Sequence, residues 1–204
     1  MSYETLTVEK RQKGVVWLMI DHPPANAINE SLMSELEYVM AELKDDEEAR
    51  VIVVASRHSK TFLAGADLKA MVQNSNDFVN EENGIAKQCE RMQACFQYFE
   101  EIPKPVIAAI NGYAFGGGCE LALACDFRLM GNGKIGLTEV NLGLIPGAGG
   151  TQRLTKLLGQ AKATELIFMA KKLEAKEAEA IGLINRAVDP NHFEEEVTAF
   201  AEQL

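Results

Sequence analysis

Two glutamates, Glu120 and Glu139, each stand beside a glycine-rich turn. Glu120 follows three consecutive glycines at 116–118 and falls in the first turn of a helix predicted to begin near Cys119. A strand, a glycine turn and a helix start together place free backbone N–H groups at the positive end of a helix. This arrangement suits a reaction that builds negative charge on a substrate oxygen and moves a proton nearby. A tight turn that only allows close packing, with a favourable first-turn acid, explains the same residues without any chemistry.

The composition excludes several functional classes. Of the 204 residues, 47% are apolar and 25% are charged, which is typical of one globular domain with a sizeable core. The formal net charge of -10 argues against nucleic-acid binding, although a local Lys or Arg cluster would still hold a phosphate-bearing small ligand. No apolar stretch is long enough to span a membrane, and the polar N-terminus does not resemble a signal peptide. We expect a cytoplasmic protein without membrane contact.

The cysteines and histidines do not follow a metal-binding pattern. The chain has 4 cysteines without a Cys-x-x-Cys pair, and its 3 histidines lie far from them in sequence. Buried free thiols in a reducing compartment are the simpler expectation. We therefore predict no metal site.

The hydrophobic pattern alternates between strands and helices. The predicted strands lie at 6–20 (a hairpin turning at Lys13 and Gly14), 51–55, 106–110, 126–130 and 134–137, and a turn and strand are predicted over 182–189. The predicted helices follow Asn29 as N-cap and then lie at 85–102, from about 119, after the glycine loop 143–153, and at 161–171, 174–181 and 192–204. We interpret the apolar stripe from Ile85 and Cys89 to Ile102 as core packing, and residues 71–83 as a mobile loop. This order predicts a single α/β domain.

Several segments resemble the crotonase (enoyl-CoA hydratase/isomerase) family. They are AGADL at 64–68, NGYAFGGGCELA at 111–122, and Glu139 followed by GLIPGAGGTQR at 143–153. The later LxAxEA and GLINxxV patterns are similar to the same family, and the matches cover nearly the whole chain in the family's order. The resemblance implies a crotonase-like fold in which repeated ββα units form a right-handed spiral, with residues 1–204 as one core domain.

The resemblance also implies a thioester site with an oxyanion hole made of two backbone N–H groups. By position the donors are Ala66 and Gly117, and each lies on a turn of small residues before a predicted helix. Taken singly, the turn at Ala66 is a plain helix entry and Asp67 a helix cap. The residues that the resemblance places along the acyl-CoA substrate are Ala25, Ala64, Ala66, Asp67, Leu68 and Gly117. Lys60 and Lys69 flank the first turn and are the nearest cations for CoA phosphates, unless they are simply solvated.

The two glutamates favour one reaction within the family. Hydratases resemble one another in having both acids, whereas isomerases keep the acid matching Glu139 and vary the one matching Glu120. Adding water to a trans-2-enoyl-CoA needs a base for the water at C3 and an acid for C2, and two carboxylates near one water can share these roles. The pair favours an enoyl-CoA hydratase, a lyase of fatty acid β-oxidation or related acyl-CoA metabolism, with CoA as part of the substrate and no separate cofactor.

Other functions are compatible with parts of the pattern. The alternatives are a Δ3-Δ2-enoyl-CoA isomerase, another crotonase-type reaction such as thioester hydrolysis, and a non-catalytic binding member of the fold. A serine protease of the related ClpP-like spiral is disfavoured because no serine stands at the glycine turn. A dinucleotide-binding domain is disfavoured because no long strand precedes the glycine loop at 143–150.

Family members usually continue beyond the position of Leu204 with helices that close over the acyl-CoA and build a trimer. The resemblance therefore implies a homotrimer or a dimer of trimers for the full-length form. We expect the 204 residues alone to expose an apolar face and to assemble or bind poorly.

Overall fold

The computed structural model describes residues 3–67 and 84–204. Its largest sheet has six strands in the order β1-β2-β4-β7-β9-β11. The first two strands are antiparallel, and every other neighbouring pair is parallel. The strands are β1 (Leu6–Lys10), β2 (Val15–Ile20), β4 (Val51–Ser56), β7 (Val106–Ile110), β9 (Phe127–Met130) and β11 (Arg186–Ala187).

Two smaller parallel sheets lie beside the large one. One pairs β3 (Ala27–Ile28) with β6 (Gly65–Ala66). The other has the order β10-β8-β5, formed by Ile135–Gly136, Tyr113–Phe115 and Thr61–Leu63. The short strands of these sheets end at the turns that the sequence singled out.

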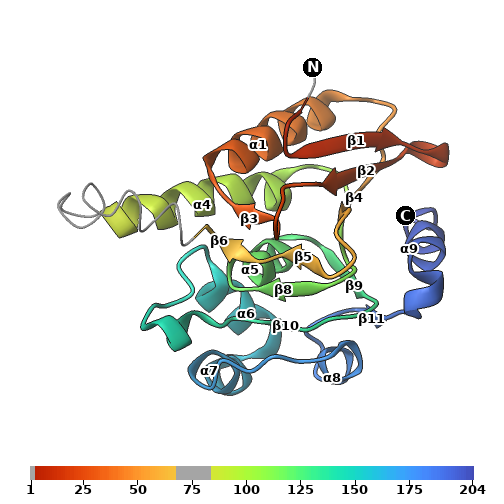
Figure 1. Cartoon of the computed structure of the whole chain (residues 1–204). Helices are drawn as coiled ribbons and strands as arrows, with labels where there is room; N and C mark the ends of the chain where they lie inside the picture. The colour runs from red at the N-terminus through yellow and green to blue at the C-terminus, as the bar shows by residue number, and fades with distance from the viewer. Residues whose placement is uncertain (1–2, 68–83) are drawn as a thin grey trace.

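The helices follow the short strands in a repeated order. A strand of the large sheet, a short strand and a helix succeed one another as β2-β3-α1, β4-β5-β6-α4, β7-β8-α5 and β9-β10-α6 (Figure 1). The α-helices are α1 (Glu30–Asp45), α4 (Gly84–Glu101), α5 (Gly117–Ala124), α6 (Gly150–Leu158), α7 (Gln160–Phe168), α8 (Ala175–Ala180) and α9 (Phe193–Ala201). The 3-10 turns are η1 (Gln12–Gly14), η2 (Glu139–Leu142) and η3 (Pro190–His192). This repetition agrees with the predicted ββα units.

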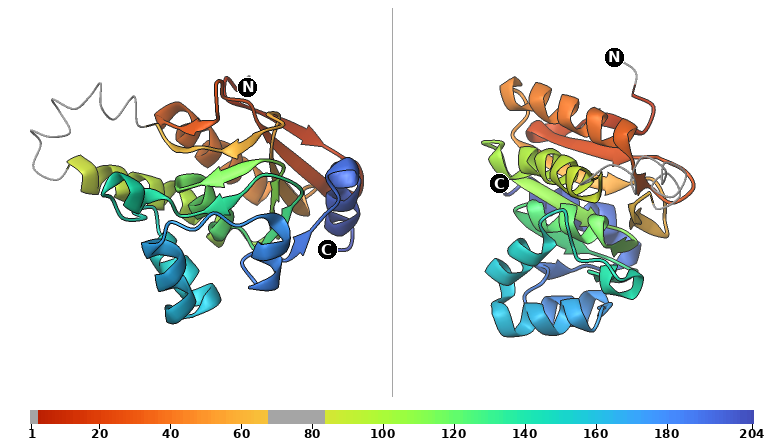
Figure 2. Two further views of the ribbon diagram at one scale, coloured as in Figure 1. Left: turned by 60° about the horizontal axis from the view of Figure 1, so that its bottom comes forward. Right: turned by 90° about the vertical axis from the view of Figure 1, so that its left-hand side faces the viewer.

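Both faces of the large sheet are buried, as its parallel strands require. Along β4, Ile52 and Val54 face the main core together with α1, α4 and α5. Val51 and Val53 point to the opposite face, where Val197 of α9 covers them. Figures 1 and 2 show α9 on the side of the sheet away from the other helices.

Local signals in the first half of the chain are confirmed. The hairpin turns at Lys13 and Gly14, with φ of 57° and 77°. Asn29 caps α1, because its side-chain oxygen accepts a hydrogen bond from the backbone N–H of Leu32 at 3.0 Å. The helix predicted near Cys119 begins two residues earlier, at Gly117, because Gly116 adopts a φ of 53° that turns the chain directly into α5.

Several predicted boundaries in the second half were too long. The helix predicted at 161–171 ends at Phe168, and the last helix ends at Ala201. The turn and strand predicted over 182–189 are confirmed, with turns at 182–185 and the strand at Arg186–Ala187. The loop predicted at 71–83 and the helix entry after Asp67 lie outside the described residues.

Candidate active site

The two predicted oxyanion donors lie close together although they are far apart in sequence. A Cβ atom built on Gly117 would lie 3.5 Å from the backbone nitrogen of Ala66. Gly117 is the first residue of α5, so its N–H has no acceptor within the helix. The next N–H after Ala66, that of Asp67, donates to Ile28 of β3 at 3.1 Å, so the Ala66 N–H points away from β3. Both N–H groups are thus available to one ligand atom between β6 and α5 (Figure 1).

The three glycines at 116–118 have different roles. Gly116 has a positive φ of 53°, and a Cβ there would lie 3.1 Å from Oε1 of Glu139. A Cβ on Gly118 would lie 2.2 Å from the carbonyl oxygen of Leu63, so this glycine permits close backbone packing. The packing interpretation of the turn therefore holds for Gly118, whereas Gly116 and Gly117 face the cavity and its acids.

Glu120 is a buried carboxyl group with one firm contact. The residue is 2% exposed, and its Oε1 accepts a hydrogen bond from the backbone N–H of Gly150 at 2.8 Å. Burial, and next the charge of Glu139, raise the pKa of Glu120 from 4.5 to about 7. A carboxyl group that titrates near neutrality can take up and release a proton under physiological conditions.

Glu139 begins η2 and points its carboxyl group at the glycine turn. Both of its side-chain oxygens are buried, and neither has a hydrogen-bond partner within residues 3–67 and 84–204. Burial raises the pKa of Glu139 above its ordinary value. Its polar atoms are therefore free to bind a ligand group or a water in the cavity.

A mostly apolar cavity of about 170 Å³ connects these groups. Ala66, Gly117, Glu120 and Glu139 all line it. One wall comes from α4 and the opposite wall from the segment after η2, and the residues are Ile85, Gln88, Cys89, Met92, Leu142, Leu144, Ile145, Gly147 and Ala148. An apolar chain attached to a thioester would lie along these side chains with its carbonyl oxygen near the two donors.

The apolar stripe on α4 is only partly core packing. Met92, Cys95, Phe96 and Phe99 are buried, as predicted. Ile85 is 53% exposed and lines the cavity, and Cys89 lines it too. The prediction for these two residues was wrong because the N-terminal turns of α4 extend beyond the sheet, so the helical period continues along the cavity wall.

The sequence profile described as Enoyl-CoA hydratase/isomerase matches residues 10–204. The chain belongs to this family. It is 40% identical to "Crotonyl-CoA hydratase" of Syntrophomonas wolfei, covering 100% of this chain and 76% of that protein. It is 40% identical to "Short-chain-enoyl-CoA hydratase" of Clostridium acetobutylicum, covering 94% and 71%.

Solved structures of the family share the fold. A crystal structure of enoyl-CoA hydratase from Bacillus anthracis superimposes with a TM-score of 0.91 at 36% identity, over 98% of this chain and 76% of that one. Pseudomonas aeruginosa DspI gives a TM-score of 0.88 at 33% identity, over 98% and 79%. The predicted crotonase-like α/β fold is confirmed.

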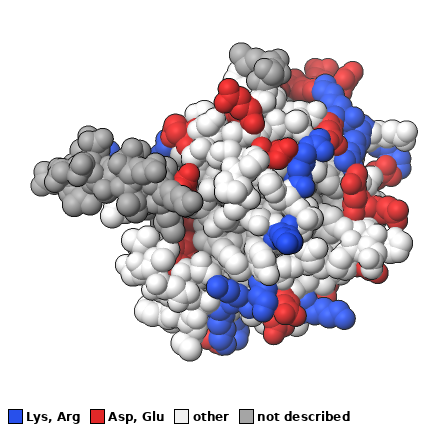
Figure 3. All heavy atoms as spheres, viewed as in Figure 1, with Lys and Arg blue, Asp and Glu red and all other residues white. Residues whose placement is uncertain are grey.

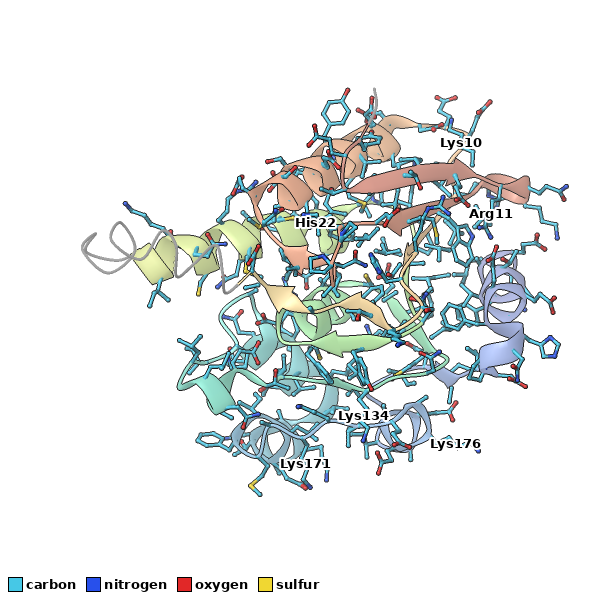
Figure 4. The ribbon with its side chains drawn as sticks, viewed as in Figure 1. Lys10, Arg11, His22, Lys134, Lys171 and Lys176 are labelled. Atoms are coloured by element: carbon cyan, nitrogen blue, oxygen red, sulfur yellow. The ribbon has the colours of Figure 1, made fainter. Side chains whose placement is uncertain are left out.

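The remaining residues of the family pattern lie at different distances from the cavity. Ala64 lines it, whereas Ala25 and Asp67 do not. Ala25 lies in a loop fixed by buried Asn26, whose amide donates to Ser56 Oγ at 2.7 Å and to the Phe62 carbonyl at 3.0 Å. Beside this loop lies His22 (Figure 4), whose Nδ1–H tautomer donates to the Ala27 carbonyl and accepts a bond from the Asn29 amide at Nε2. Contact of this loop with substrate stays a prediction.

Three other predicted residues are not placed at the site. Leu68 and Lys69 lie outside the described residues. Lys60 is exposed, and its role toward CoA phosphates stays a prediction. Figure 3 shows Lys and Arg side chains at the lower edge of the view, and Figure 4, from the same side, labels Lys134 and Lys171 there. These two lysines form ion pairs with Glu174 and Glu165.

Within residues 3–67 and 84–204, no group of three His, Cys, Asp or Glu side chains could hold a metal ion. No helix in the same ranges is long and apolar enough to cross a bilayer.

The raised pKa of Glu120 predicts a stability that falls as pH rises. The folded chain binds the proton of the Glu120 carboxyl group more tightly than the unfolded chain does. The stability that this proton contributes is therefore lost as pH rises from the ordinary pKa of 4.5 to about 7. Glu120→Gln has no charge to bury and keeps an acceptor for Gly150. At about pH 8 we expect it to be more stable than the parent by about 1–3 kcal/mol, by urea unfolding, and no more stable at about pH 4. Equal stabilities at the higher pH would contradict the buried-charge account.

Proposed function

We infer that this chain is an enoyl-CoA hydratase, which adds water across the 2,3 double bond of a trans-2-enoyl-CoA to give a 3-hydroxyacyl-CoA. The observation that carries this inference is the meeting of two buried carboxyl groups and two convergent backbone N–H groups at one apolar cavity. Relatives at 40% identity that are named as crotonyl-CoA and short-chain-enoyl-CoA hydratases support it.

The proposed mechanism gives each group one task. The thioester oxygen accepts hydrogen bonds from the N–H groups of Ala66 and Gly117, which stabilise the negative charge that develops on it. Glu120 takes a proton from water as the water oxygen bonds to C3. The π electrons shift toward the thioester, and protonation of C2 by Glu139 completes the product. At this point Glu120 carries the proton from water and Glu139 is ionised. Transfer of that proton from Glu120 to Glu139, through solvent, restores both groups, so that atoms and charges balance.

The surroundings of the two glutamates suit these roles. Gly150 N–H donates to one oxygen of Glu120, which favours the carboxylate at that oxygen. Burial raises the pKa of Glu139, whereas the backbone N–H groups of Thr138 and of Glu139 itself lower it, so burial is what lets this carboxyl group hold a proton. Two like charges close together resist full ionisation, and one proton is held by the pair rather than by either residue alone.

A direct assay separates hydration from the alternatives. The parent chain is mixed with crotonyl-CoA, and loss of the enoyl absorbance is followed together with formation of 3-hydroxybutyryl-CoA. Hydration supports the proposal. Conversion of a 3-enoyl-CoA to the 2-enoyl isomer without hydration would select an isomerase, and release of free CoA thiol would select thioester hydrolysis. Acyl-CoA binding without any turnover would indicate a non-catalytic member.

The wider context is proposed on the same basis. We place the reaction in fatty acid β-oxidation or related acyl-CoA metabolism, in the cytoplasm. CoA enters only as part of the substrate, and no separate cofactor or metal takes part in the proposed steps.

We also propose that the full-length form is a homotrimer or a dimer of trimers. Phe168 and Met169 end α7 with exposed fractions of 74% and 67%, and such side chains are usually covered in an assembly. If they lie between copies, Phe168→Glu will shift sedimentation of the full-length form toward the monomer, whereas the same change at exposed Lys156 will not. Unchanged sedimentation of Phe168→Glu would contradict this placement.

A further inference from the structure

We propose that Arg153 is a positioning residue for the hydration step, because it fixes the backbone segment 148–150 that holds the catalytic carboxylate of Glu120. This inference rests on the proposed function for its kinetic consequence. Arg153 itself does not line the cavity and needs no contact with substrate.

Arg153 makes a forked contact at the start of α6. One guanidinium nitrogen, Nη1, donates to the carbonyl oxygen of Ala148 at 2.7 Å. The other, Nη2, donates to Oε2 of Glu100 on α4, also at 2.7 Å. The Arg153 side chain is only 13% exposed, whereas Glu100 is 43% exposed. The fork therefore ties the turn before α6 to the end of α4 from inside the protein.

The turn itself is shaped around this guanidinium. Gly149 has a φ of 105°, and a Cβ there would lie 2.2 Å from Nη1 of Arg153. The positive φ favours glycine at this place, and the guanidinium lies directly against it. The contact therefore packs the guanidinium onto the turn.

The same turn delivers the hydrogen bonds that hold Glu120. The N–H of Gly150 donates to Oε1 of Glu120 at 2.8 Å, and the backbone of Ala148 is a further donor to this carboxyl group. Ala148 is therefore held by Arg153 through its carbonyl and faces Glu120 through its N–H. Movement of the segment 148–150 would therefore move these backbone N–H donors and the Glu120 carboxylate together. An error of about 1 Å in such a group is enough to cost a large part of the rate.

Arg153 is also the cation that opposes the acids around Glu120. Within residues 3–67 and 84–204, the ionisable groups that interact electrostatically with Glu120 include Glu139 on η2, Cys89 on α4, Cys119 on its own helix and Arg153 on α6. Glu139 raises the pKa of Glu120, and Arg153 lowers it. Without the guanidinium, Glu120 would hold its proton to a higher pH and would be a base in a smaller fraction of molecules.

The test compares three variants on the whole chain. Arg153→Gln removes the charge and the fork, and Arg153→Lys keeps the charge but loses the fork. Arg91→Gln is the matched control, because it breaks a similar half-buried ion pair with Glu37, between α1 and α4 and away from the turn. For each variant, kcat, KM and the pH profile are measured with crotonyl-CoA. The titration midpoint of Glu120 is measured separately by ¹³C NMR of carboxyl-labelled glutamate, with the signal assigned by Glu120→Gln.

A positioning role predicts a specific pattern. Arg153→Gln lowers kcat about tenfold, with KM changed by less than about twofold. It also raises the midpoint of the acid limb of the pH–rate profile, and the Glu120 titration midpoint measured by NMR, by about half to one pH unit. Arg153→Lys restores the midpoint but only part of kcat. Arg91→Gln lowers the unfolding midpoint and leaves the kcat of folded protein and the Glu120 midpoint unchanged.

The opposite results would overturn the inference. An unmoved Glu120 midpoint in Arg153→Gln, or equal kcat losses in the Arg153 and Arg91 variants, would show that Arg153 only supports the fold. If Arg153→Gln does not fold, Arg153→Lys decides through its kcat, and full activity in it would contradict the positioning role. Failure of the parent chain to hydrate any enoyl-CoA would instead refute the proposed function, while the NMR titration would still test the effect of Arg153 on Glu120.

Discussion

Replacing Glu139 by Gln is expected to lower kcat for hydration of crotonyl-CoA by about 10²–10⁴-fold, with little change in KM. The variant keeps the shape of the side chain and replaces its acidic O–H by an amide NH2 that does not give up a proton at neutral pH. Neither oxygen of Glu139 has a partner within residues 3–67 and 84–204, so the amide breaks no hydrogen bond there. The loss therefore reports the proton transfer to C2 rather than a change in folding.

The equivalent change at Glu120 is expected to have an effect of the same order, but for a different reason. Glu120→Gln retains an acceptor for Gly150 and loses the base that activates water. The two residues are proposed to exchange the same proton within one reaction cycle. The double variant should therefore be only slightly slower than either single variant. Steady-state rates are measured in both directions with each variant, and exposed Glu90→Gln on α4 is the control.

Two outcomes would contradict this assignment. A Glu139→Gln variant with the parent's kcat would remove Glu139 from the chemistry. A double variant whose loss equals the product of the single losses would show that the two carboxyl groups act independently. In either case the control should match the parent, since its side chain lies outside the cavity.

The sequence predicted which residues meet at the cavity better than it predicted the ends of the elements. The motifs around Ala66, Gly117, Glu120 and Glu139 are local, and each includes a glycine-rich turn that restricts the backbone. Their convergence could be inferred only from the family resemblance. The distance that joins Ala66 to Gly117 depends on how β6 packs against α5, and no local pattern encodes it.

The errors have common physical causes. Helical periodicity marked Ile85 and Cys89 as apolar neighbours of the core, but periodicity does not distinguish a core face from a cavity wall. The start of α5 was placed too late because glycine is a poor helix former, whereas a helix end that carries donors tolerates it. Gly150 was not predicted as a hydrogen-bond donor to Glu120, because every residue except proline has a backbone N–H and the sequence does not show which of them meets a carboxylate.

Removing the N–H of Ala66 alone is expected to lower kcat/KM by about 10²–10³-fold. The change is Ala66→lactic acid, which replaces one amide by an ester and keeps the methyl group and the chain length. The Ala66 N–H points away from β3, so no strand pairing with β3 is lost. The thioester oxygen would keep only the Gly117 donor, and charge on that oxygen grows in the transition state, so the effect should fall mainly on kcat.

The matched control is the same ester replacement at Ala114. Its N–H donates to the carbonyl oxygen of Lys134 at 2.9 Å, between β8 and β10, and the residue is fully buried. This ester should lower the free energy of unfolding by about 1–3 kcal/mol while kcat/KM of the folded protein stays near that of the parent. Equal rate losses at the two positions would mean that ester substitution acts through the fold. An active Ala66 ester would instead leave Gly117, at the first turn of α5, as the donor that stabilises the oxyanion, and the role of the AGADL turn would then be to shape the cavity beside it.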